Sequence, residues 1–341
     1  MITPSYTTWA GRTIILRWSL IYREIEIPPP KIKNIWSKKL TNNIRYSPTL
    51  NCFYRESWLT SLACSRLVRV KHFKFLHKVV FFSTKNSEET QLDPNWVTGF
   101  SDAEGCFSII ITKRSNLSWR VSVSFEINLH IKDIDCLYKI QNFFGVGLVS
   151  CRPERFRCVY RVTKIEDIMN VIIPHFTSYP LRTQKYSDFC LWAKAVELMF
   201  HKKHLTSTGF NTILSFYKSI NLGMSPSVLA SFPNISIQKR EAVLLPLGLN
   251  PYWVSGFTAG DGGFSIGIRK ITGQIYFRFH ITQHVRDTLL MKLLISFFNC
   301  GKVIIRQNRC DYYVQDFSSI YNVIIPHFTK YPLQGIKMLD L

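Results

Sequence analysis

The sequence WVTGFSDAEG at residues 96–105 recurs as WVSGFTAGDG at residues 253–262. Two other segments recur in the same order, namely FEINLHIKDIDCLYKIQNFFG (125–145) as FHITQHVRDTLLMKLLISFFN (279–299), and VIIPHFTSYPL (171–181) as VIIPHFTKYPL (323–333). Internal repeats at a nearly constant spacing indicate a duplicated structural unit. We therefore expect two related domains with an approximate twofold axis in one monomeric chain. The natural partner of such a protein is an object with its own approximate twofold, such as duplex DNA.

Each copy predicts the same order of elements. The first helix begins at Asp93-Pro94 or Asn250-Pro251, because Asx caps a helix and proline fits its first turn. It ends at a glycine, Gly105 or Gly262, which we expect to form a left-handed cap. The remaining elements follow from the hydrophobic periodicity: strands at 107–114 and 264–270, strands from 119 and 275, helices from 133 and 287, strands at 147–152, 157–163, 301–306 and 310–316, and helices at 165–176 and 317–328.

The resulting fold class is α+β, with two pseudo-symmetric αββαββα units. Each unit should have an antiparallel sheet with helices on one face. The second strand alternates apolar and polar residues over 119–128, so the other face of each sheet should be polar. We predict four segments: a basic extension (1–90), a first domain (91–228), a linker (229–250) and a second domain (251–341).

The polar face of each sheet is rich in side chains that read base edges and phosphates. In copy one the candidates are Ser108, Thr112, Arg114, Arg120, Ser122, Ser124, Asn128, Arg152 and Arg161. In copy two they are Ser265, Arg269, Tyr276, Arg278, His280, Thr282, Arg306 and Gln315. Any half-solvated antiparallel sheet shows polar alternation, but two matched, arginine-rich sheets favour DNA binding.

The charge of the whole chain supports a polyanionic partner. It carries 43 Lys and Arg against 22 Asp and Glu, a net charge of +21, of which +10 (15 minus 5) lies in residues 1–90 and +11 (28 minus 17) in residues 91–341. Nucleic acid is the commonest such partner and an anionic membrane the second. A hydrophobic content of 46% excludes a disordered chain, and the apolar runs are too short to span a membrane.

The N-terminal segment has two interpretations. Its first 23 residues contain Arg12, Arg17 and Arg23 but no acid, which weakly resembles an organellar transit segment. Alternatively, residues 1–90 are a basic leader or an upstream extension without a role in the fold.

The first helix of each copy carries the sharpest functional signal. Gly99 and Ala103, like Gly256 and Gly260, are one helical turn apart, so the two helices can pack closely at the pseudo-twofold axis. An acid follows each pair directly, Glu104 in copy one and Asp261 in copy two. Carboxylates are disfavoured at the negative end of a helix dipole, which favours a functional role. Two carboxylates meeting there predict a site for Mg²⁺ or Mn²⁺ that supports phosphodiester hydrolysis.

These repeated motifs resemble those of the LAGLIDADG homing endonucleases of the double-motif, single-chain type, and the match is best to members encoded by fungal mitochondrial group I introns. The resemblance covers roughly residues 80–341, including both IIPHFxxYPL segments. It implies a saddle of two sheets that grips the DNA major groove, cleavage of both strands with 3′ overhangs, and a mitochondrial location. The last acid of each motif, Glu104 or Asp261, would hold the divalent metal. Asp102, replaced by Ala259 in copy two, would not be catalytic.

Two departures from the family pattern bear on activity. The resemblance implies a polar or basic support group on the second sheet, often Gln or Lys. The matching positions here are Tyr276 and the stretch of Ile304 and Arg306, which depart from that pattern. Arg306 and its counterpart Arg152 are candidates for positioning phosphate or water. Residues 181–222 of copy one predict two further helices, whereas copy two has only nine residues of the same stretch. The leading hypothesis is thus a site-specific DNA endonuclease; the alternatives are an RNA-binding maturase of a group I intron and an inactive DNA-binding remnant.

Overall fold

The computed structural model describes residues 6–9, 12–15, 91–116 and 118–341. The N-terminal unit, residues 1–89, contains strands β1 (Tyr6–Trp9) and β2 (Arg12–Ile15), which pair antiparallel. The predictions of a transit segment or leader within residues 1–90 otherwise lie outside the described residues. Residues 90–341 form a second compact unit, which contains both sequence repeats.

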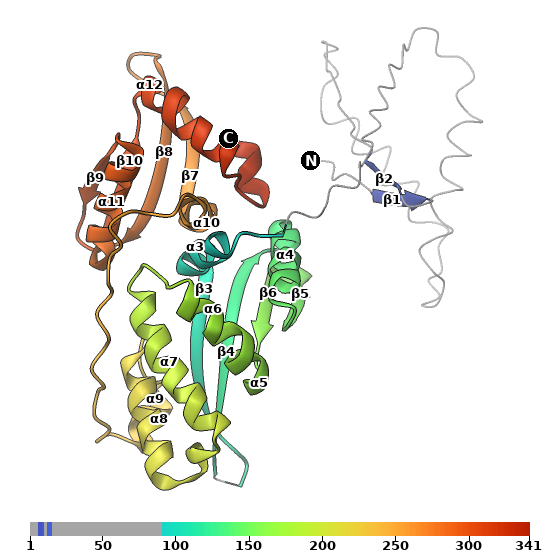
Figure 1. Cartoon of the computed structure of the whole chain (residues 1–341), viewed down its shortest axis with the longest axis vertical. Coiled ribbons are helices and arrows are strands. Elements are labelled where there is room, and N and C mark those ends of the chain that lie inside the picture. The colour runs from blue at the N-terminus through green and yellow to red at the C-terminus, as the bar shows by residue number, and fades with distance from the viewer. Residues whose placement is uncertain (1–5, 10–11, 16–90, 117) are drawn as a thin grey trace, which may run out of the picture. The chain divides into compact units, whose positions relative to one another are not determined.

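The first repeat folds as an antiparallel sheet with helices packed on one face (Figure 1). The sheet has the strand order β3-β4-β6-β5. The elements are α3 (Pro94–Glu104), β3 (Gly105–Lys113), β4 (Trp119–His130), α4 (Ile134–Phe144), β5 (Leu148–Arg152), β6 (Arg157–Val162), α5 (Ile165–Asp167), the π-helical turn η4 (Ile168–Ile172) and α6 (Ile173–Ser178).

The second repeat has the same topology, with the strand order β7-β8-β10-β9. Its elements are α10 (Pro251–Asp261), β7 (Gly262–Ile268), β8 (Ile275–His284), α11 (Thr288–Phe298), β9 (Lys302–Ile305), β10 (Arg309–Val314), α12 (Phe317–Ser319), the π-helical turn η7 (Ile320–Ile324), α13 (Ile325–Lys330) and the short helix η8 (Ile336–Asp340). The α+β class and the repeated αββαββα order are confirmed.

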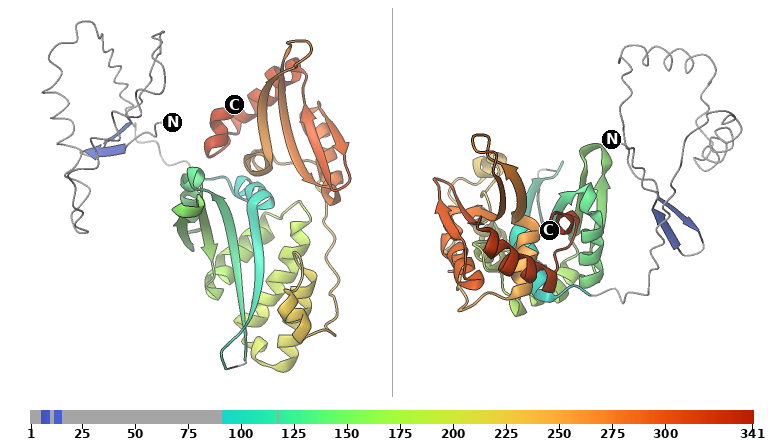
Figure 2. Two further views of the ribbon diagram at one scale, coloured as in Figure 1. Left: turned by 180° about the vertical axis from the view of Figure 1, so that it is seen from behind. Right: turned by 90° about the horizontal axis from the view of Figure 1, so that it is seen from above.

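The strand register separates the two faces of each sheet. Phe107 lies opposite Phe125 in β3 and β4, and Phe264 lies opposite Phe279 in β7 and β8. These rings stack at centroid distances of 5.1 Å in both halves and belong to the helix-covered face. Because side chains alternate along a strand, the residues between them point to the other face. Figure 2 shows both sheets with their helices from two further directions.

The two halves join through α3 and α10, which pack against each other (Figure 1). A Cβ atom on Gly99 would overlap the Trp253 carbonyl oxygen, and one on Gly256 would overlap the Trp96 carbonyl oxygen. A Cβ on Gly260 would overlap the side chain of Ala103. The contact is reciprocal, as a twofold axis requires, and it allows only glycine where the backbones meet.

Gly105 and Gly262 do not form the left-handed caps that we predicted. Their φ and ψ angles are −72° and 147° for Gly105, and −92° and 172° for Gly262, which is extended backbone. Each helix passes directly into a strand, so no left-handed residue is needed. Glycine is required for space instead, because a Cβ on Gly105 would lie 2.6 Å from the Ser101 carbonyl oxygen and one on Gly262 would lie 2.5 Å from Thr258 Cγ2.

The repeated IIPHF segment fastens the third helix of each copy to the first. Thr98 donates a hydrogen bond to the Tyr179 carbonyl at 3.1 Å and lies 3.1 Å from His175 Nε2. In copy two, Ser255 donates to the Tyr331 carbonyl at 2.7 Å and lies near His327. Burial lowers the pKa of both histidines to about 4, so each is a neutral packing residue.

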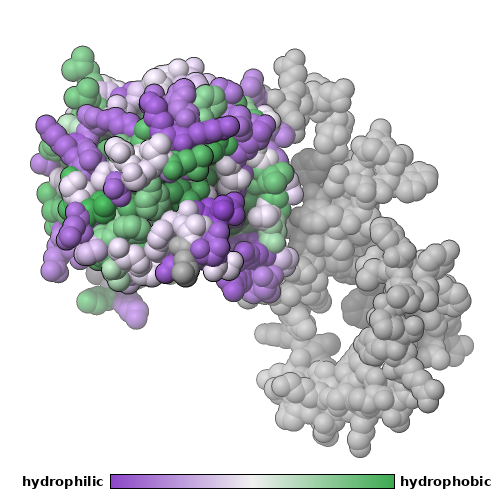
Figure 3. Space-filling model, turned by 90° about the horizontal axis from the view of Figure 1, so that it is seen from below, coloured by the Kyte–Doolittle hydropathy of each residue, from purple (hydrophilic) through white to green (hydrophobic). Residues whose placement is uncertain are grey.

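Copy one continues into three further α-helices, α7 (Lys185–Phe200), α8 (Ser207–Ser219) and α9 (Pro226–Ser231). A segment without helix or strand follows from 232 to 250 and is held along α7 and α8. Arg240 forms an ion pair with Asp188 at 2.9 Å. The backbone N–H of Gln238 donates a hydrogen bond to Ser219 Oγ at 2.7 Å. Figure 3 shows one face of the molecule, on which apolar residues gather in the middle and hydrophilic ones surround them.

We expect Gly256→Ala to destabilise the fold strongly. In a helix this substitution normally stabilises by about 1 kcal/mol, but here overpacking should dominate and lower the free energy of unfolding by about 1–3 kcal/mol. Gly248→Ala is the matched control, because a Cβ there meets no atom within 4 Å. Urea unfolding measures both variants, and equal stability of the two would contradict the close backbone contact.

Candidate functional site

Glu104 and Asp261 are the last residues of α3 and α10, so the packing of these helices brings both acids to the pseudo-twofold axis. A Cβ on Gly260 would lie 3.1 Å from Glu104 Cγ, which places the Glu104 side chain over the end of α10. Both acids are partly buried. The two carboxylates thus come from different repeats and share one small region.

Burial raises the pKa of both carboxyl groups. For Asp261 desolvation is the largest cause and the charge of Glu104 the second, and together they raise its pKa to about 6. Desolvation also raises the pKa of Glu104. Two like charges in a partly buried site favour binding of a cation, since a cation lowers the free energy of the doubly ionised form.

Two lysines that the sequence analysis missed supply positive charge beside these acids. Lys185 Nζ donates to the carbonyl oxygens of Ser101 at 3.1 Å and Ala103 at 3.0 Å, at the C-terminal end of α3. Lys337 Nζ donates to the carbonyl oxygens of Thr258 and Gly260, at the end of α10. An ammonium group has three donors, so each lysine retains one N–H for another acceptor.

The repeat itself contained a signal for these lysines. Lys185 and Lys337 are separated by 152 residues, which is also the offset between the VIIPHF segments at 171 and 323. Burial lowers the pKa of both ammonium groups, and the neighbouring carboxylates counteract it. Lys337 shows that copy two retains the part of the stretch after residue 333 that reaches the site.

Gln283, and not Tyr276 or Arg306, is the polar residue of the second sheet that contacts one of the two paired acids, Glu104 and Asp261. Its Nε2 donates a hydrogen bond to Asp261 Oδ2. Arg306 instead pairs with Asp311 at 3.1 Å, and Arg152 is exposed at the end of β5 without an ion pair among the described residues. The position that corresponds to Gln283 in copy one is Leu129, so the two acids have different surroundings.

Asp102 is a buried structural carboxylate. It accepts hydrogen bonds from the backbone N–H of Arg182 at 2.8 Å, from both the N–H and the hydroxyl of Thr183 at 3.0 and 2.7 Å, and from Trp253 Nε1 at 2.8 Å. Burial raises its pKa, although these four bonds act in the opposite direction. In copy two Ala259 replaces this carboxylate, and the equivalent Trp96 Nε1 is buried without a partner among the described residues.

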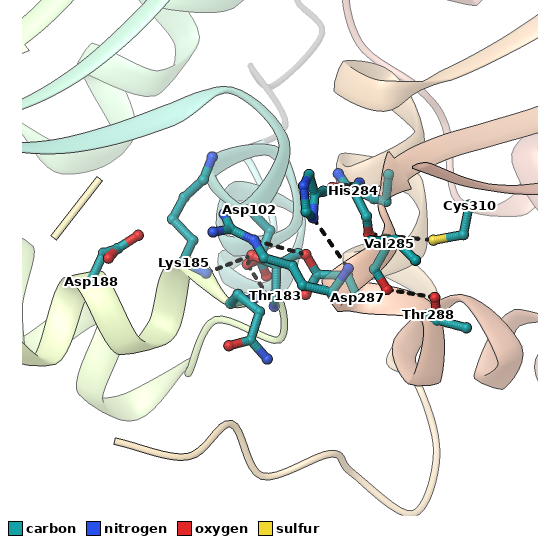
Figure 4. A network of polar contacts seen from close by, with 12 residues as sticks. Asp102, Thr183, Lys185, Asp188, His284, Val285, Asp287, Thr288 and Cys310 are labelled. Carbon is teal, nitrogen blue, oxygen red and sulfur yellow. Dashed lines mark hydrogen bonds and ion pairs between the residues drawn. The ribbon is translucent and has the colours of Figure 1, made fainter. Parts of the chain in front are cut away.

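Two further aspartates connect the halves reciprocally. Asp287 of copy two accepts from the Gln184 N–H at 2.8 Å, just before Lys185, and Asp133 of copy one accepts from the Ile336 N–H at 2.8 Å, just before Lys337. Figure 4 shows Asp102, Thr183 and Lys185 close to Asp287 and His284 of the other half. Each lysine is therefore positioned by the opposite repeat.

A cavity of about 410 Å³ opens at this junction. Its lining includes Asp261, Lys185 and Gln283 together with Arg286 and Arg309. Acids and cations from both repeats face the same space. No group of three or more His, Cys, Asp or Glu side chains with metal-binding geometry occurs in the described part of the chain.

The register places the predicted DNA-contacting residues on the helix-free face of each sheet. Ser108 lies opposite Ser124 and Thr112 opposite Arg120, while Ser265 lies opposite Arg278. The others on these faces are Ser122, Asn128, Arg152, Arg161, Tyr276, His280 and Thr282, whereas Arg114, Arg269, Arg306 and Gln315 directly follow the strand ends.

Not all of these side chains are free. Ser124 is buried in the centre of the sheet, and its hydroxyl donates a hydrogen bond to Glu126 Oε1 at 2.8 Å. Arg161 also pairs with Glu126, at 2.9 Å, and Thr282 donates to Asp311 at 2.8 Å. Sequence alternation placed Glu126 on the polar face, but it does not assign the local partners of a residue.

No helix in the described part of the chain is long and apolar enough to cross a membrane.

Comparison with known proteins agrees with this geometry. The chain is 39% identical over 266 residues to a probable intron-encoded endonuclease 2 of Neurospora crassa, an alignment that spans 73% of this chain and 58% of that protein. A probable intron-encoded endonuclease 3 of the same fungus is 35% identical, over 79% of this chain and 52% of that protein. The chain thus spans about half the length of these relatives.

Solved structures show the same fold. I-SmaMI bound to an uncleaved DNA target in the presence of calcium ions is 35% identical, with a TM-score of 0.70 over 73% of this chain and 88% of that chain. The LAGLIDADG homing endonuclease I-GzeII in complex with its DNA target is 34% identical, with a TM-score of 0.69 over 73% and 87% of the two chains.

The family model described as LAGLIDADG endonuclease matches residues 97–196 and 254–341, one match for each repeat. Each match includes most of the helix that ends in one of the two acids, the following sheet, and the lysine beside the site. This chain belongs to the LAGLIDADG endonuclease family.

Proposed function

We propose that the chain is a site-specific endonuclease that cuts both strands of duplex DNA. The observation that carries the proposal is the meeting of Glu104 and Asp261 at a pseudo-twofold axis, with a polar sheet face on either side. Duplex DNA has a local twofold axis, so the acid of one half can act on one strand and the acid of the other half on the other strand. I-SmaMI and I-GzeII, which share the fold, are bound to DNA targets.

The donor set fits a hard divalent cation, for which we propose Mg²⁺ or Mn²⁺. Glu104 and Asp261 would hold it, and two carboxylates with substrate phosphate oxygens are a common set of ligands for Mg²⁺. When bound, the cation polarises the scissile phosphate and makes water a better nucleophile. Calcium ions accompany uncleaved DNA in one I-SmaMI structure, which supports divalent-metal binding in the family.

The lysines and Gln283 complete the proposed site. The third N–H of Lys185 or Lys337 is available to a phosphate oxygen or to water beside each acid, and the carbonyl bonds fix the position of the ammonium group. Gln283 orients the Asp261 carboxylate by donating to one of its oxygens. Groups that hold the ligand of a metal in place typically affect activity without touching the reacting atoms.

We propose that the helix-free faces of the two sheets recognise the DNA target. The unit with both repeats, residues 91–341, carries a net charge of +11 (28 minus 17), and exposed arginines such as Arg120 and Arg278 lie on these faces. Phosphate contacts supply salt-dependent affinity, whereas side chains in the major groove supply specificity. Because both acids belong to one chain, we propose a monomer as the active form.

The proposed cellular setting is the mitochondrion. One relative is an uncharacterised mitochondrial protein RF1 of Saccharomyces cerevisiae, and another is a protein in the ND4 intron 1 of Podospora anserina. Binding to a group I intron RNA is the second candidate function. The paired acids favour cleavage, since RNA binding does not require them.

Neutralising either acid should abolish cleavage but not binding. We expect Glu104→Gln and Asp261→Asn each to reduce the cleavage rate by at least about 10³-fold, because each removes a metal ligand. Duplex targets selected from a randomised library, incubated with Mg²⁺, provide the assay, and gel shifts measure binding. Glu166→Gln, at an exposed acid of α5, is the control and should cut normally. Undiminished cutting by both site variants would refute the assignment, and tight intron-RNA binding without any DNA cutting would favour the maturase.

Asp261 should also make the metal-free protein less stable as the pH rises. Its folded pKa of about 6 exceeds the ordinary value of 3.8, so its contribution to stability is full below pH 4 and is lost as the pH rises through 6. In EDTA, Asp261→Asn should therefore be more stable than the natural chain at pH 7.5, by about 1–3 kcal/mol, and nearly equal to it at pH 4. Thermal unfolding at both pH values measures this, and a natural chain that is the more stable at pH 7.5 would refute it.

Gln283 contacts Asp261 and has no polar counterpart in copy one, so its loss should slow the cutting of one strand more than that of the other. Gln283→Leu makes copy two resemble copy one and should slow one strand by about 10- to 100-fold, so that nicked plasmid accumulates. Leu129→Gln is the matched variant and should not slow either strand. Equal slowing of both strands by Gln283→Leu would show that Gln283 supports the whole site and not one acid.

A further inference from the structure

One arginine on the helix-free face of the first sheet is held in a fixed orientation by an acid. Arg161 of β6 lies opposite Glu126 of β4, and its Nε and Nη2 donate to the two carboxylate oxygens at 2.9 and 3.1 Å. The Arg161 side chain is 48% exposed, whereas that of Glu126 is only 16% exposed. The Glu126 carboxylate also accepts a hydrogen bond from the buried Ser124 at 2.8 Å. The exposed guanidinium is therefore oriented by a side chain that is itself held in the sheet.

Arg278 of β8 has a similar arrangement on the helix-free face of the second sheet. With the amide oxygen of Gln315 turned toward it, Nη2 and Nε of Arg278 donate to that oxygen at 2.6 and 2.9 Å. The guanidinium also lies 5.7 Å from the centre of the Tyr276 ring, which is two residues earlier on the same face of the strand. Arg278 is exposed. Both arginines thus use the same edge of the guanidinium, formed by Nε and Nη2, for a contact within the protein.

This arrangement leaves the other edge of each guanidinium available. The group has five N–H donors in one plane. Once Nε and one N–H of Nη2 are used, the end-on edge keeps the second N–H of Nη2 and both of Nη1. That edge matches two acceptors side by side, which guanine presents as O6 and N7 in the major groove. Because the guanidinium is already oriented, less conformational entropy is lost when the contact forms.

We propose that Arg161 and Arg278 each read one guanine of the target DNA. Glu126 and Gln315 are positioning residues, which act through the arginines that they orient. A phosphate is the less suitable acceptor for Arg161, because the neighbouring Glu126 carboxylate repels it. This inference rests on the proposed function, since it requires the helix-free faces to contact duplex DNA.

The two guanines should lie in different halves of the target and should not be related by its twofold axis. The residue of copy one that corresponds to Arg278 is Ser124, and the residue of copy two that corresponds to Arg161 is Tyr313. The two arginines therefore occupy different positions in their repeats. The target should accordingly depart from a palindrome at both guanines.

The test is selection of a randomised duplex library by binding to the full chain with Ca²⁺, followed by affinity measurements on the selected target. We expect one guanine preference to be lost in both Arg161→Ala and Glu126→Ala, and another, in the other half of the target, in both Arg278→Ala and Gln315→Ala. Exchange of either guanine for adenine should weaken binding by the natural chain by about 10- to 100-fold. In the variants concerned the same exchange should weaken binding by about 3-fold or less.

Glu126→Gln tests the positioning role separately from the charge. Its amide oxygen can accept from both Nε and Nη2, as that of Gln315 does for Arg278, so the guanine preference should be retained. A residue that only stabilised the sheet would not distinguish glutamine from alanine through one base pair of the target. Thermal unfolding midpoints of Glu126→Ala and Glu126→Gln check that both variants are folded.

Arg120→Ala is the control for a phosphate contact. Arg120 is exposed near the hairpin end of β3 and β4, on the same face as Arg161, and has no ion pair among the described residues. Its removal should weaken binding to all sequences equally and reduce the slope of log K against log salt concentration by about one. Arg161→Ala should leave that slope unchanged.

Three results would overturn the inference. Arg161→Ala could keep every guanine preference, or it could weaken all targets equally with a smaller salt slope, which would identify a phosphate contact. Glu126→Gln could lose the guanine preference as completely as Glu126→Ala, which would exclude the positioning role. A chain that prefers no duplex sequence would contradict the proposed function as well. A chain that selects and cuts a target with the same base preferences in all the variants would contradict this inference alone.

Discussion

The backbone contact between α3 and α10 is the constraint on which the rest of the structure depends. Gly99 and Gly256 allow each helix to approach the carbonyl groups of the other. This approach makes the two repeats one compact unit and places the acids at the ends of both helices side by side. The sheets begin directly at those helix ends, at Gly105 and Gly262, so the same contact also sets where the polar faces meet.

Burial around that contact determines the electrostatics of the site. It raises the pKa of Glu104 and Asp261 and lowers the pKa of Lys185 and Lys337. Four partly buried charged groups of both signs are costly unless they are held in place. The helix-end carbonyls hold the lysines, and aspartates at the starts of the opposite helices hold the backbone just before them. These contacts hold both lysines beside the two acids.

The symmetric frame carries unsymmetric chemistry. Gln283 corresponds to Leu129 in the other repeat, Asp102 corresponds to Ala259, and the α7–α8 hairpin has no counterpart among the described residues of copy two. Duplication fixes the backbone of both halves, because the helix contact must be reciprocal. Side chains away from the axis are free to differ, and the surroundings of each acid and each sheet have diverged accordingly.

The sequence by itself determined the duplication, the order of the elements, the helix starts and the two acids, because these depend on local periodicity, capping residues and repeated spacing. The prediction of left-handed caps at Gly105 and Gly262 was wrong, because the packing of the following strand decides whether a helix ends in a turn or continues directly into that strand. Lys185, Lys337 and Gln283, the burial of Ser124 and the fourfold hydrogen bonding of Asp102 were decided only by the tertiary structure. The contacts of the two lysines, Gln283 and Asp102 join groups that are far apart in the sequence, and no local pattern encodes such contacts. The burial of Ser124 depends on the assembled sheet, in which it lies opposite Ser108.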